Sequence, residues 1–348
     1  MQLLNTLYVN TEDSFLRLDN DTIRVQVNEE TRLRVPLHHL QAVACFGRVG
    51  VSLPLMHRLA DEGIALVLLD DTGRFKARLE GATSGNVLLR RAQHAKSMDA
   101  AYCLGIARAF VAGKVKNCRQ VLLRGAREAR ESTDAAHLSR GADDLAATLR
   151  ALPSAADLDA LRGLEGEAAR QYFDRLPCML KPELREAFAM NGRTRRPPRD
   201  RFNALISFLY SMWMNDCRSA AEAAGLDPQV GFLHAVRPGR AALALDLVEE
   251  LRPFADRLAL TLLNRGQLSA EAFDVREGGA VSLKPDARKA VVIAFQQRKQ
   301  EEIQHPLLAQ PLALGLVPLV QARLLARAIR SETAGEDEGA GYVPFLFR

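Results

Sequence analysis

The sequence predicts an α+β protein in which a small β-rich N-terminal domain precedes a larger all-α domain. Two observations support this prediction. Apolar and polar residues alternate with a period of two over roughly the first 80 residues, and helical periodicity replaces that pattern after about Gly85. The expected domains are residues 1–85 and 86–330, followed by a flexible tail over 331–348.

Short strands and one helix account for the N-terminal domain. TIRVQV (22–27) and RLRVPL (32–37) each place three aliphatic side chains on one side, and the breaks DNDT, NEET and DDTG have the composition of turns. SLPLMHRLADEG (52–63) predicts a short helix with a serine N-cap and a terminating glycine. IALVLLD (64–70) then predicts a buried strand.

The second domain reads as helical from NVLLRRAQHAK (86–96) onward. Two linkers are expected, EGATSGN (80–86) and NGRTRRPPR (191–199), because the proline pair in the second excludes a helix there. The tail is acidic and glycine-rich before an apolar end. We expect it to be flexible unless YVPFLFR packs against another part of the chain.

Charge is unevenly distributed along the chain. Residues 1–85 hold 9 Lys and Arg against 11 Asp and Glu, a net charge of −2, so the remainder of a chain with net charge +5 carries +7. A basic C-terminal portion suggests a polyanionic partner such as nucleic acid, although many basic proteins have no such partner.

Several classes of protein lose support. No apolar run reaches the roughly 18 residues of a membrane helix, the N-terminus lacks the basic start of a signal peptide, and the five cysteines are too widely spaced for a zinc or disulfide framework. Nucleotide-, dinucleotide-, zincin- and serine-hydrolase motifs are absent. We therefore expect a cytoplasmic protein with no membrane association.

Glu165 is the most anomalous acid in the sequence. At 100° per residue it falls within an apolar stripe of LDALRGLEGEAARQYFDRL (158–176), formed by Leu158, Leu161, Ala168, Ala169, Tyr172, Phe173 and Leu176. An unpaired carboxylate on such a face costs several kcal/mol of desolvation. Glu165 is therefore expected to bind a metal or to be paired, with a local salt bridge to Arg162 as the alternative.

His234 precedes a predicted helix that carries three acids, Asp246, Glu249 and Glu250. The apolar residues of that helix predict a solvated position for all three, and His234 alone is equally consistent with a core or capping role. Combined with Glu165, however, the imidazole and carboxylates form a mixed N/O set that suits Mn²⁺ or Mg²⁺ rather than structural zinc. Asp246 and Glu249, three residues apart, project side by side.

A third feature is an arginine cluster around Pro197 and Pro198, formed by Arg193, Arg195, Arg196 and Arg199. The guanidinium fork matches phosphate oxygens, so we expect contacts with a DNA backbone. A solvated linker is the alternative. Further positive residues, Lys114 among them, are expected to add basic surface.

Several blocks resemble the CRISPR-associated endonuclease and integrase family that inserts new spacers, the first-numbered Cas family. The resemblance spans nearly the whole chain and rests on GATSGNVLLRRAQ, LEGEAARQYF, RRPPRDRFNALISFLYS and GLDPQVGFLHAVRPGRAALALDLVEELRP. In that family the glutamate of E-G-x-A-A, the histidine of G-x-L-H and the last acid of D-x-x-[DE] bind the metal. These fall on Glu165, His234 and Glu249, with Asp246 as the neighbouring acid. Glu249 stands where relatives often carry aspartate.

The resemblance implies an enzyme of antiviral defence that uses Mg²⁺ or Mn²⁺. It would join the 3′-hydroxyl of a short incoming spacer DNA to a phosphodiester at the CRISPR repeat boundary, and it would also cut DNA. The resemblance further implies a homodimer, with the N-terminal domain expected to dimerise, and a small ferredoxin-like CRISPR-associated partner that bridges two dimers.

Two other functions remain open. A stand-alone metal-dependent nuclease for repair or branched DNA would use the same residues without a partner protein. A non-catalytic DNA-binding scaffold would need the basic surface but not Glu165, His234 or Glu249. In all three cases we expect replacement of Glu250 to have little effect.

Overall fold

The computed structural model describes residues 6–40, 42–70, 75–79, 81, 87–190, 192–308, 311–331 and 341–346. The chain forms two compact units. The first comprises Met1–Gly85 together with Leu283–Gln296, and the second comprises Asn86–Ser282 together with Gln297–Arg348. The first unit thus includes a segment that the sequence pattern assigned to the helical domain. Of the linker expected over 80–86, only Gly81 lies within the described residues.

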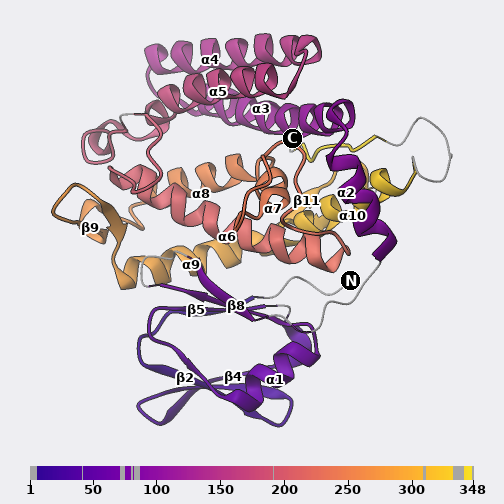
Figure 1. Cartoon of the computed structure of the whole chain (residues 1–348). Coiled ribbons are helices and arrows are strands. Elements are labelled where there is room, and N and C mark those ends of the chain that lie inside the picture. Colours follow the sequence, from indigo (N-terminus) through magenta and orange to yellow (C-terminus); the bar gives the residue numbers. More distant parts are fainter. Residues whose placement is uncertain are drawn as a thin grey trace. The chain divides into compact units, whose positions relative to one another are not determined.

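Two four-stranded sheets make up most of the first unit (Figure 1). One has the order β1-β5-β7-β8, in which β1, β5 and β7 are parallel to one another and β8 is antiparallel to β7. The other has the order β4-β3-β2-β6. The bounds are β1 (Thr6–Val9), β2 (Ser14–Asp19), β3 (Thr22–Val27), β4 (Glu30–Pro36), β5 (Ala42–Phe46), β6 (Gly50–Val51), β7 (Ala65–Leu69), β8 (Phe75–Leu79) and helix α1 (Leu53–Asp61).

The strands and the helix predicted for this unit are confirmed. Period-two alternation places Ile23 and Val25 of β3 in the core, where Leu55 and Leu59 of α1 join them. Leu33 of β4 is an exception, because its side chain is 47% exposed although it belongs to an apolar row.

The second unit is predominantly helical, as the sequence predicts. Its helices are α2 (Val87–Ser97), α3 (Ala100–Glu128), α4 (Ser132–Ala151), α5 (Leu158–Arg175), α6 (Arg201–Ala223), α7 (Ala242–Val248), α8 (Arg252–Asn264), α10 (Val317–Ser331) and the last residues of α9 (Pro285–Gln300). Two short two-stranded sheets, which the all-α expectation did not include, are β9 (Phe273–Val275) with β10 (Val281–Leu283), and β11 (Glu302–Gln304) with β12 (Pro311–Ala313). The second pair is antiparallel.

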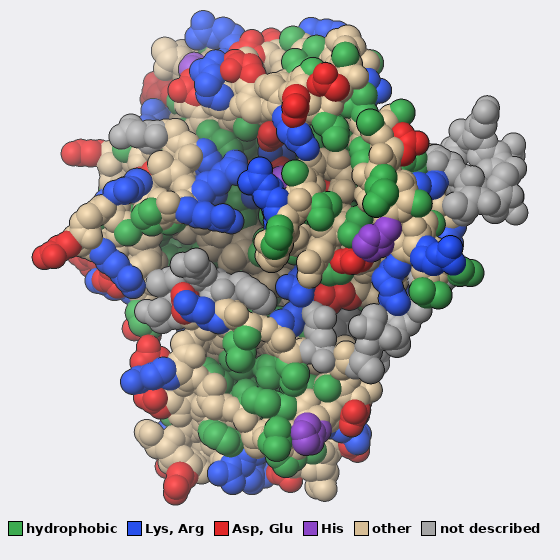
Figure 2. Space-filling view, viewed as in Figure 1, with side chains coloured by type: hydrophobic (Ala, Val, Ile, Leu, Met, Phe, Trp, Pro, Cys, Tyr) green, Lys and Arg blue, Asp and Glu red, His purple; other side chains and the backbone are tan. Residues whose placement is uncertain are grey.

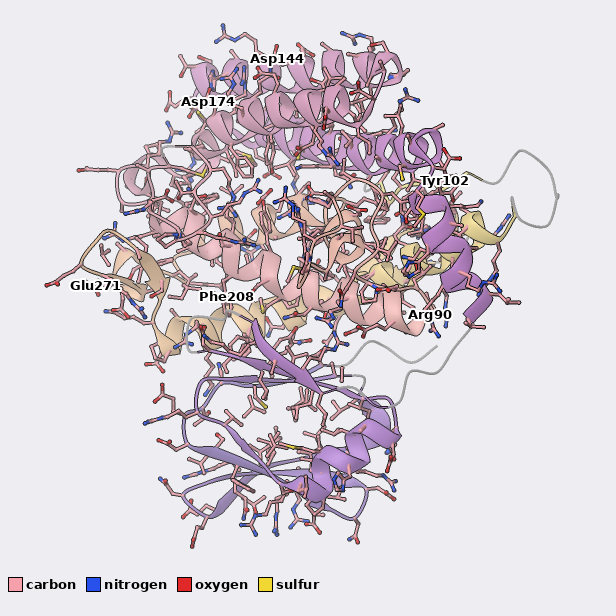
Figure 3. The ribbon with its side chains drawn as sticks, viewed as in Figure 1. Arg90, Tyr102, Asp144, Asp174, Phe208 and Glu271 are labelled. Atoms are coloured by element: carbon pink, nitrogen blue, oxygen red, sulfur yellow. The ribbon has the colours of Figure 1, made fainter. Side chains whose placement is uncertain are left out.

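Two groups of helices form the core of this unit (Figures 1 and 3). Helices α3, α4 and α5 pack against one another, and α6 packs against α7, α8 and α10. Aspartate side chains begin the long helices: Asp99, Asp157 and Asp200 accept hydrogen bonds from backbone N–H groups in the first turns of α3, α5 and α6. These caps fix where the helices that carry the site begin.

Residues 341–346 are packed, which differs from the flexible tail expected over 331–348. Phe345 is fully buried and stacks with Phe254 and His305, and the Tyr342 ring lies against Phe110. The reason is that the apolar side chains of Tyr342 and Phe345 are buried against other parts of the helical unit. Residues 332–340 lie outside the described part of the chain. Among the helices that are described, none is long and apolar enough to span a membrane.

Candidate active site

Glu165 and Glu249 face each other across a lysine ammonium. Glu165 projects from α5, Glu249 follows the last residue of α7, and Lys114 lies on α3. The Lys114 Nζ contacts Glu165 Oε1 and lies 2.7 Å from Glu249 Oε2. Lys114 and Glu249 are only 8% and 4% exposed, whereas the Glu165 side chain is 24% exposed. The expected local pairing of Glu165 with Arg162 does not form, because Arg162 binds Asp159 and the Leu233 carbonyl instead.

His234 is held beside this pair by Asp246. The buried Asp246 carboxylate accepts hydrogen bonds from the backbone N–H groups of Phe232, Leu233 and His234. Its Oδ1 lies 2.7 Å from His234 Nδ1. This contact orients the imidazole so that Nε2 lies 4.0 Å from Glu249 Oε1. A side chain at Gly231 would clash, since a Cβ there would come within 2.7 Å of Asp246 Oδ2.

Glu249 is ionised in this setting. Its burial alone would raise the carboxyl pKa, but the charges of Arg252 and Lys114 outweigh burial and hold the pKa well below its ordinary value. Arg252 contributes directly, because its Nε donates to Glu249 Oε1 at 2.9 Å. The Arg252 guanidinium in turn lies 4.6 Å from the centroid of the Tyr210 ring.

A buried polar cluster lies next to the glutamates. Asp256 of α8 accepts hydrogen bonds from the hydroxyls of Tyr210, at 2.6 Å, and Tyr172, at 3.0 Å. Burial raises the pKa of Asp256 to about 6, although the two hydroxyls act in the opposite direction. Asp256, both tyrosines, Lys114 and Glu165 all border one small cavity of about 10 Å³. A cavity of that size holds about one water molecule.

The donor set fits a divalent cation in its chemistry. Glu249 Oε2 is buried and receives no hydrogen bond, although a positive charge lies close to it, so this oxygen has a lone pair directed at a cation. His234 Nε2 is the imidazole nitrogen that Asp246 leaves free. As the side chains stand, however, no group of three His, Cys, Asp or Glu among the described residues is close enough together to hold an ion. The Lys114 ammonium lies where two of the expected ligands meet.

The expectation that Asp246, Glu249 and Glu250 are solvated is wrong, and Glu250 shows this most clearly. Its carboxylate is fully buried and accepts hydrogen bonds from the Tyr342 hydroxyl, the Phe345 N–H and Gln321 Nε2. Burial raises its pKa to about 8 against the effect of these three donors. Asp246 and Glu249 are buried as well. Glu250 faces the C-terminal segment and not the site, so its replacement cannot be neutral.

The arginine cluster divides into two kinds of residue. Arg193 is turned inward: it donates to the Thr194 carbonyl, Asn203 and Ser207 and lies 5.3 Å from the centroid of the Tyr210 ring. These contacts favour a structural role for Arg193 over the expected contact with DNA. Three members are exposed: Arg195, Arg196 and Arg199. Figure 2 shows Lys and Arg side chains gathered on the visible face of the helical unit.

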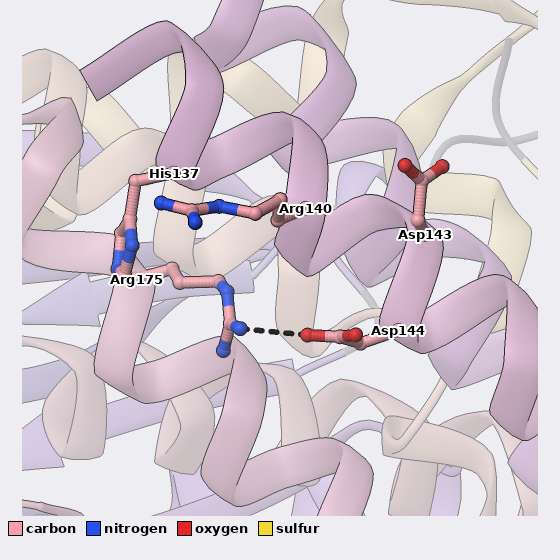
Figure 4. Close-up of a pocket in the computed structure, with 5 residues that line it drawn as sticks. All are labelled: His137, Arg140, Asp143, Asp144 and Arg175. Carbon is pink, nitrogen blue, oxygen red and sulfur yellow. Dashed lines mark hydrogen bonds and ion pairs between the residues drawn. The ribbon is translucent and has the colours of Figure 1, made fainter. Parts of the chain in front are cut away.

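A separate, open pocket of about 430 Å³ lies at α4 and the end of α5 (Figure 4). His137, Arg140 and Asp143 border it, together with an ion pair of 2.6 Å between Arg175 and Asp144. None of the residues predicted for the site lines this pocket.

A family model described as CRISPR associated protein Cas1 matches residues 7–297 of the chain. The chain belongs to the Cas1 family. A CRISPR-associated endonuclease Cas1 from Moorella thermoacetica is 51% identical over 347 residues, which is 99% of each protein. Membership of this family makes the chain a CRISPR-associated endonuclease and integrase of spacer acquisition, as the sequence motifs predicted.

Solved structures show the same fold for this Cas1 chain. A casposase bound to integration product has a TM-score of 0.80 at 20% identity and covers 96% of this chain and 93% of its own. A chain of a Cas6-RT-Cas1–Cas2 complex has a TM-score of 0.82 at 24% identity. That match covers 99% of this Cas1 chain but only 36% of the longer one.

Lys114 and Arg252 are the site residues that the sequence analysis did not assign. Lys114 was counted only as basic surface, yet it falls on an apolar face of α3 with Phe110, Cys118 and Val121. The test that singled out Glu165, a charge within an apolar stripe, would have found it. Arg252 could have been predicted to form an ion pair with Glu249, because it follows Glu249 by three positions.

Proposed function

We propose that Glu165, His234 and Glu249 hold a Mg²⁺ or Mn²⁺ ion with which this Cas1 protein joins and cuts DNA phosphodiesters. The observation that carries the proposal is that two glutamates contact one ammonium cation, while His234 Nε2 lies 4.0 Å from Glu249 Oε1. Carboxylate oxygens and one imidazole suit these ions, and three protein ligands leave further positions open. When bound, the ion lowers the pKa of an attacking hydroxyl and offsets charge on the phosphate oxygens.

The remaining residues of the site orient the ligands. Asp246 accepts a hydrogen bond from the Nδ1–H group of His234 and thereby leaves the Nε2 lone pair for the ion. Arg252 fixes Glu249 through its Nε–H, and the Tyr210 ring supports the Arg252 guanidinium. The catalytic set is therefore Glu165, His234 and Glu249, with Asp246 acting through the histidine.

The reaction follows from the family. The 3′-oxygen of the incoming spacer DNA forms a new bond to a phosphorus at the repeat boundary, while the bond from that phosphorus to the existing strand breaks. The attacking hydroxyl loses its proton and the departing oxygen gains one, so the step needs no external energy source. With water as the nucleophile the same exchange is hydrolysis, which accounts for the endonuclease activity.

The proposed partners are the spacer and repeat DNA, a second copy of this chain, and a small ferredoxin-like protein that bridges two dimers. The charge of +7 outside residues 1–85 supports a DNA partner. The Cas1–Cas2 assembly and the casposase on its product support an oligomeric enzyme on DNA.

Strand transfer by Glu165→Gln, His234→Ala and Glu249→Gln, each with Mn²⁺ and a repeat-containing duplex, tests this assignment. We expect each variant to lose on the order of 1000-fold in rate, because each removes a ligand of an ion that supplies several kcal/mol. Glu167→Gln is the matched control, since Glu167 lies on the same helix but is exposed and paired with Arg170. A folded variant that transfers strands at the wild-type rate would remove its residue from the site.

The same assay separates the other functions. Cleavage without joining, and without any need for the partner protein, would indicate a stand-alone nuclease. DNA binding with no metal-dependent reaction would indicate a scaffold.

A further inference from the structure

Lys114 is an unusual residue for a metal site. Its side chain is 10% exposed, and its ammonium contacts the two glutamates that the proposed function assigns as ligands. The Lys114 ammonium therefore lies between two proposed ligands of a divalent ion.

Two facing carboxylates need a cation between them. When no metal is bound, another cation must take that position. Like charges at such a short separation repel strongly where water is largely excluded. Glu249 cannot rotate away, because its other oxygen is held by Arg252 and its backbone follows directly from the buried helix α7. A lysine has a flexible four-carbon stem and a single point charge, so it can supply this cation and can also withdraw.

We propose that Lys114 is the resident counter-cation of this site: it holds Glu165 and Glu249 together when no divalent ion is bound, and the ion displaces it. The proposal rests on the proposed function for the assignment of the two ligands. Metal binding is then an exchange of one cation for another. Because Glu165 is the more exposed ligand, the exchange proceeds from its side.

The exchange has a consequence that a fixed ion pair lacks. If the ammonium must leave, then part of the metal's binding free energy is spent on displacing it, and removing the ammonium strengthens metal binding. If Lys114 is instead a fixed support that stays in place with the metal, removing it leaves metal binding unchanged or weakens it. The sign of the change in Mn²⁺ affinity distinguishes the two roles.

The test is Mn²⁺ binding to the full-length protein without DNA, measured by calorimetry and by the electron paramagnetic resonance signal of free Mn²⁺. Lys114→Met keeps the length of the side chain and removes the charge. We expect it to bind Mn²⁺ at least about tenfold more tightly than the wild type, which corresponds to about 1.4 kcal/mol. Its melting temperature without metal should fall, and saturating Mn²⁺ should restore it towards that of the metal-loaded wild type.

Lys116→Met is the matched control, because Lys116 is exposed on the same helix two residues away. It should change neither the affinity nor the melting temperature. Lys114→Arg provides a second variant in case Lys114→Met does not fold. A guanidinium can engage both carboxylates with a rigid fork, so we expect weaker Mn²⁺ binding than in the wild type.

Unchanged or weaker Mn²⁺ binding by folded Lys114→Met would overturn the proposal, and so would unchanged or tighter binding by Lys114→Arg. Glu165→Gln keeps this outcome separate from the proposed function. If the wild type binds Mn²⁺ and Glu165→Gln does not, the ligand assignment stands whatever the lysine variants do. If neither the wild type nor Lys114→Met binds Mn²⁺, the ligand set and the role of Lys114 both fail.

Discussion

Glu249 and Glu250 are neighbours in the chain with opposite surroundings. Glu249 faces Lys114 and Arg252, which keep it ionised, whereas Glu250 faces the C-terminal segment and is surrounded by hydrogen-bond donors from Gln321, Tyr342 and Phe345. The backbone of the same segment is tied in by Asn117 Nδ2, which donates to the carbonyls of both Glu250 and Phe345. We therefore expect replacement of Glu249 to affect catalysis and replacement of the adjacent Glu250 to affect stability.

Replacing Glu250 with alanine should destabilise the fold by at least about 3 kcal/mol. The reason is that three buried donors lose their acceptor, at about 1–3 kcal/mol for each unsatisfied group. Denaturant unfolding at pH 7 measures the loss. Glu183→Ala, at an exposed position, should stay within about 0.5 kcal/mol of the wild type. Equal stability of the two variants would contradict the contacts described for Glu250.

Replacing Asp246 with asparagine should weaken Mn²⁺ binding by about 10- to 100-fold, as expected when the partner of a metal-binding histidine is changed. The amide would place an N–H₂ group against backbone N–H donors and disturb the loop that presents His234. Calorimetric titration measures the affinity, with exposed Asp274→Asn as the control. An affinity equal to that of the wild type would show that Asp246 does not position the histidine.

Three helices meet at a single carboxyl group. Asp256 of α8 joins Tyr172 of α5 to Tyr210 of α6, and the charged groups that act on it are Arg193 and Arg252. Asp256, Tyr172 and Tyr210 are all buried. The junction makes the packing of the helices sensitive to the protonation of one residue.

This junction predicts a pH dependence of stability. The Asp256 pKa is raised from 3.8 to about 6 in the folded protein, so the folded state binds the proton more tightly than the unfolded state. The contribution is fully present below pH 3.8 and is lost as the pH rises through about 6. At about 1.36 kcal/mol per pKa unit, the loss reaches about 3 kcal/mol.

Unfolding free energies of the wild type and Asp256→Asn, measured from pH 4 to pH 8, check this expectation. The difference between the two proteins isolates Asp256 from Glu250, whose pKa is also raised. We expect the advantage of the wild type to shrink as the pH rises. Parallel pH profiles would show that Asp256 does not titrate in this range.

Sequence periodicity predicted the elements better than it predicted the surroundings of the acids. It located α1, α5 and the strands β3 and β4 from alternating apolar and polar positions, and β7 from a continuous apolar run. It failed for α7, which has no solvated face: Ala242, Leu243, Ala244, Asp246, Leu247 and Val248 are all buried. In a helix that is buried on every side, polar residues opposite the apolar stripe are also enclosed and must find partners.

The partners themselves were beyond sequence reasoning. Lys114 and Glu165 are 51 residues apart, and Glu250 and Phe345 are 95 residues apart. No periodicity within one helix can show such tertiary contacts. Periodicity singled out Glu165, and the resemblance to a family assigned roles to His234, Asp246 and Glu249. In the structure Lys114 contacts both glutamates, and His234 contacts Asp246 and lies 4.0 Å from Glu249.

Across the whole molecule, the uneven charge predicts how DNA binding depends on salt. Arg195→Ala and Arg196→Ala should each flatten the plot of log affinity against log salt concentration by about one unit, because one fewer counterion is released. Arg193→Ala should lower the melting temperature and leave the slope unchanged, since its guanidinium is used inside the protein. Titrations against one duplex at several salt concentrations measure the slopes. Parallel slopes for Arg195→Ala, Arg196→Ala and the wild type would exclude phosphate contacts at both positions.

The first unit is built from two segments that are far apart in the chain, and this affects the timing of its folding during synthesis. That unit needs Leu283–Gln296 in addition to its first 85 residues, and the Gln296 amide donates to the Thr6 carbonyl at the start of β1. At roughly 5–20 residues per second, a ribosome takes about 10–40 s to extend the chain from one part to the other. Helices α2 to α8 emerge during that interval, while β1 still lacks its late partner. Strand β1 therefore completes these contacts only after the ribosome has synthesised Leu283–Gln296.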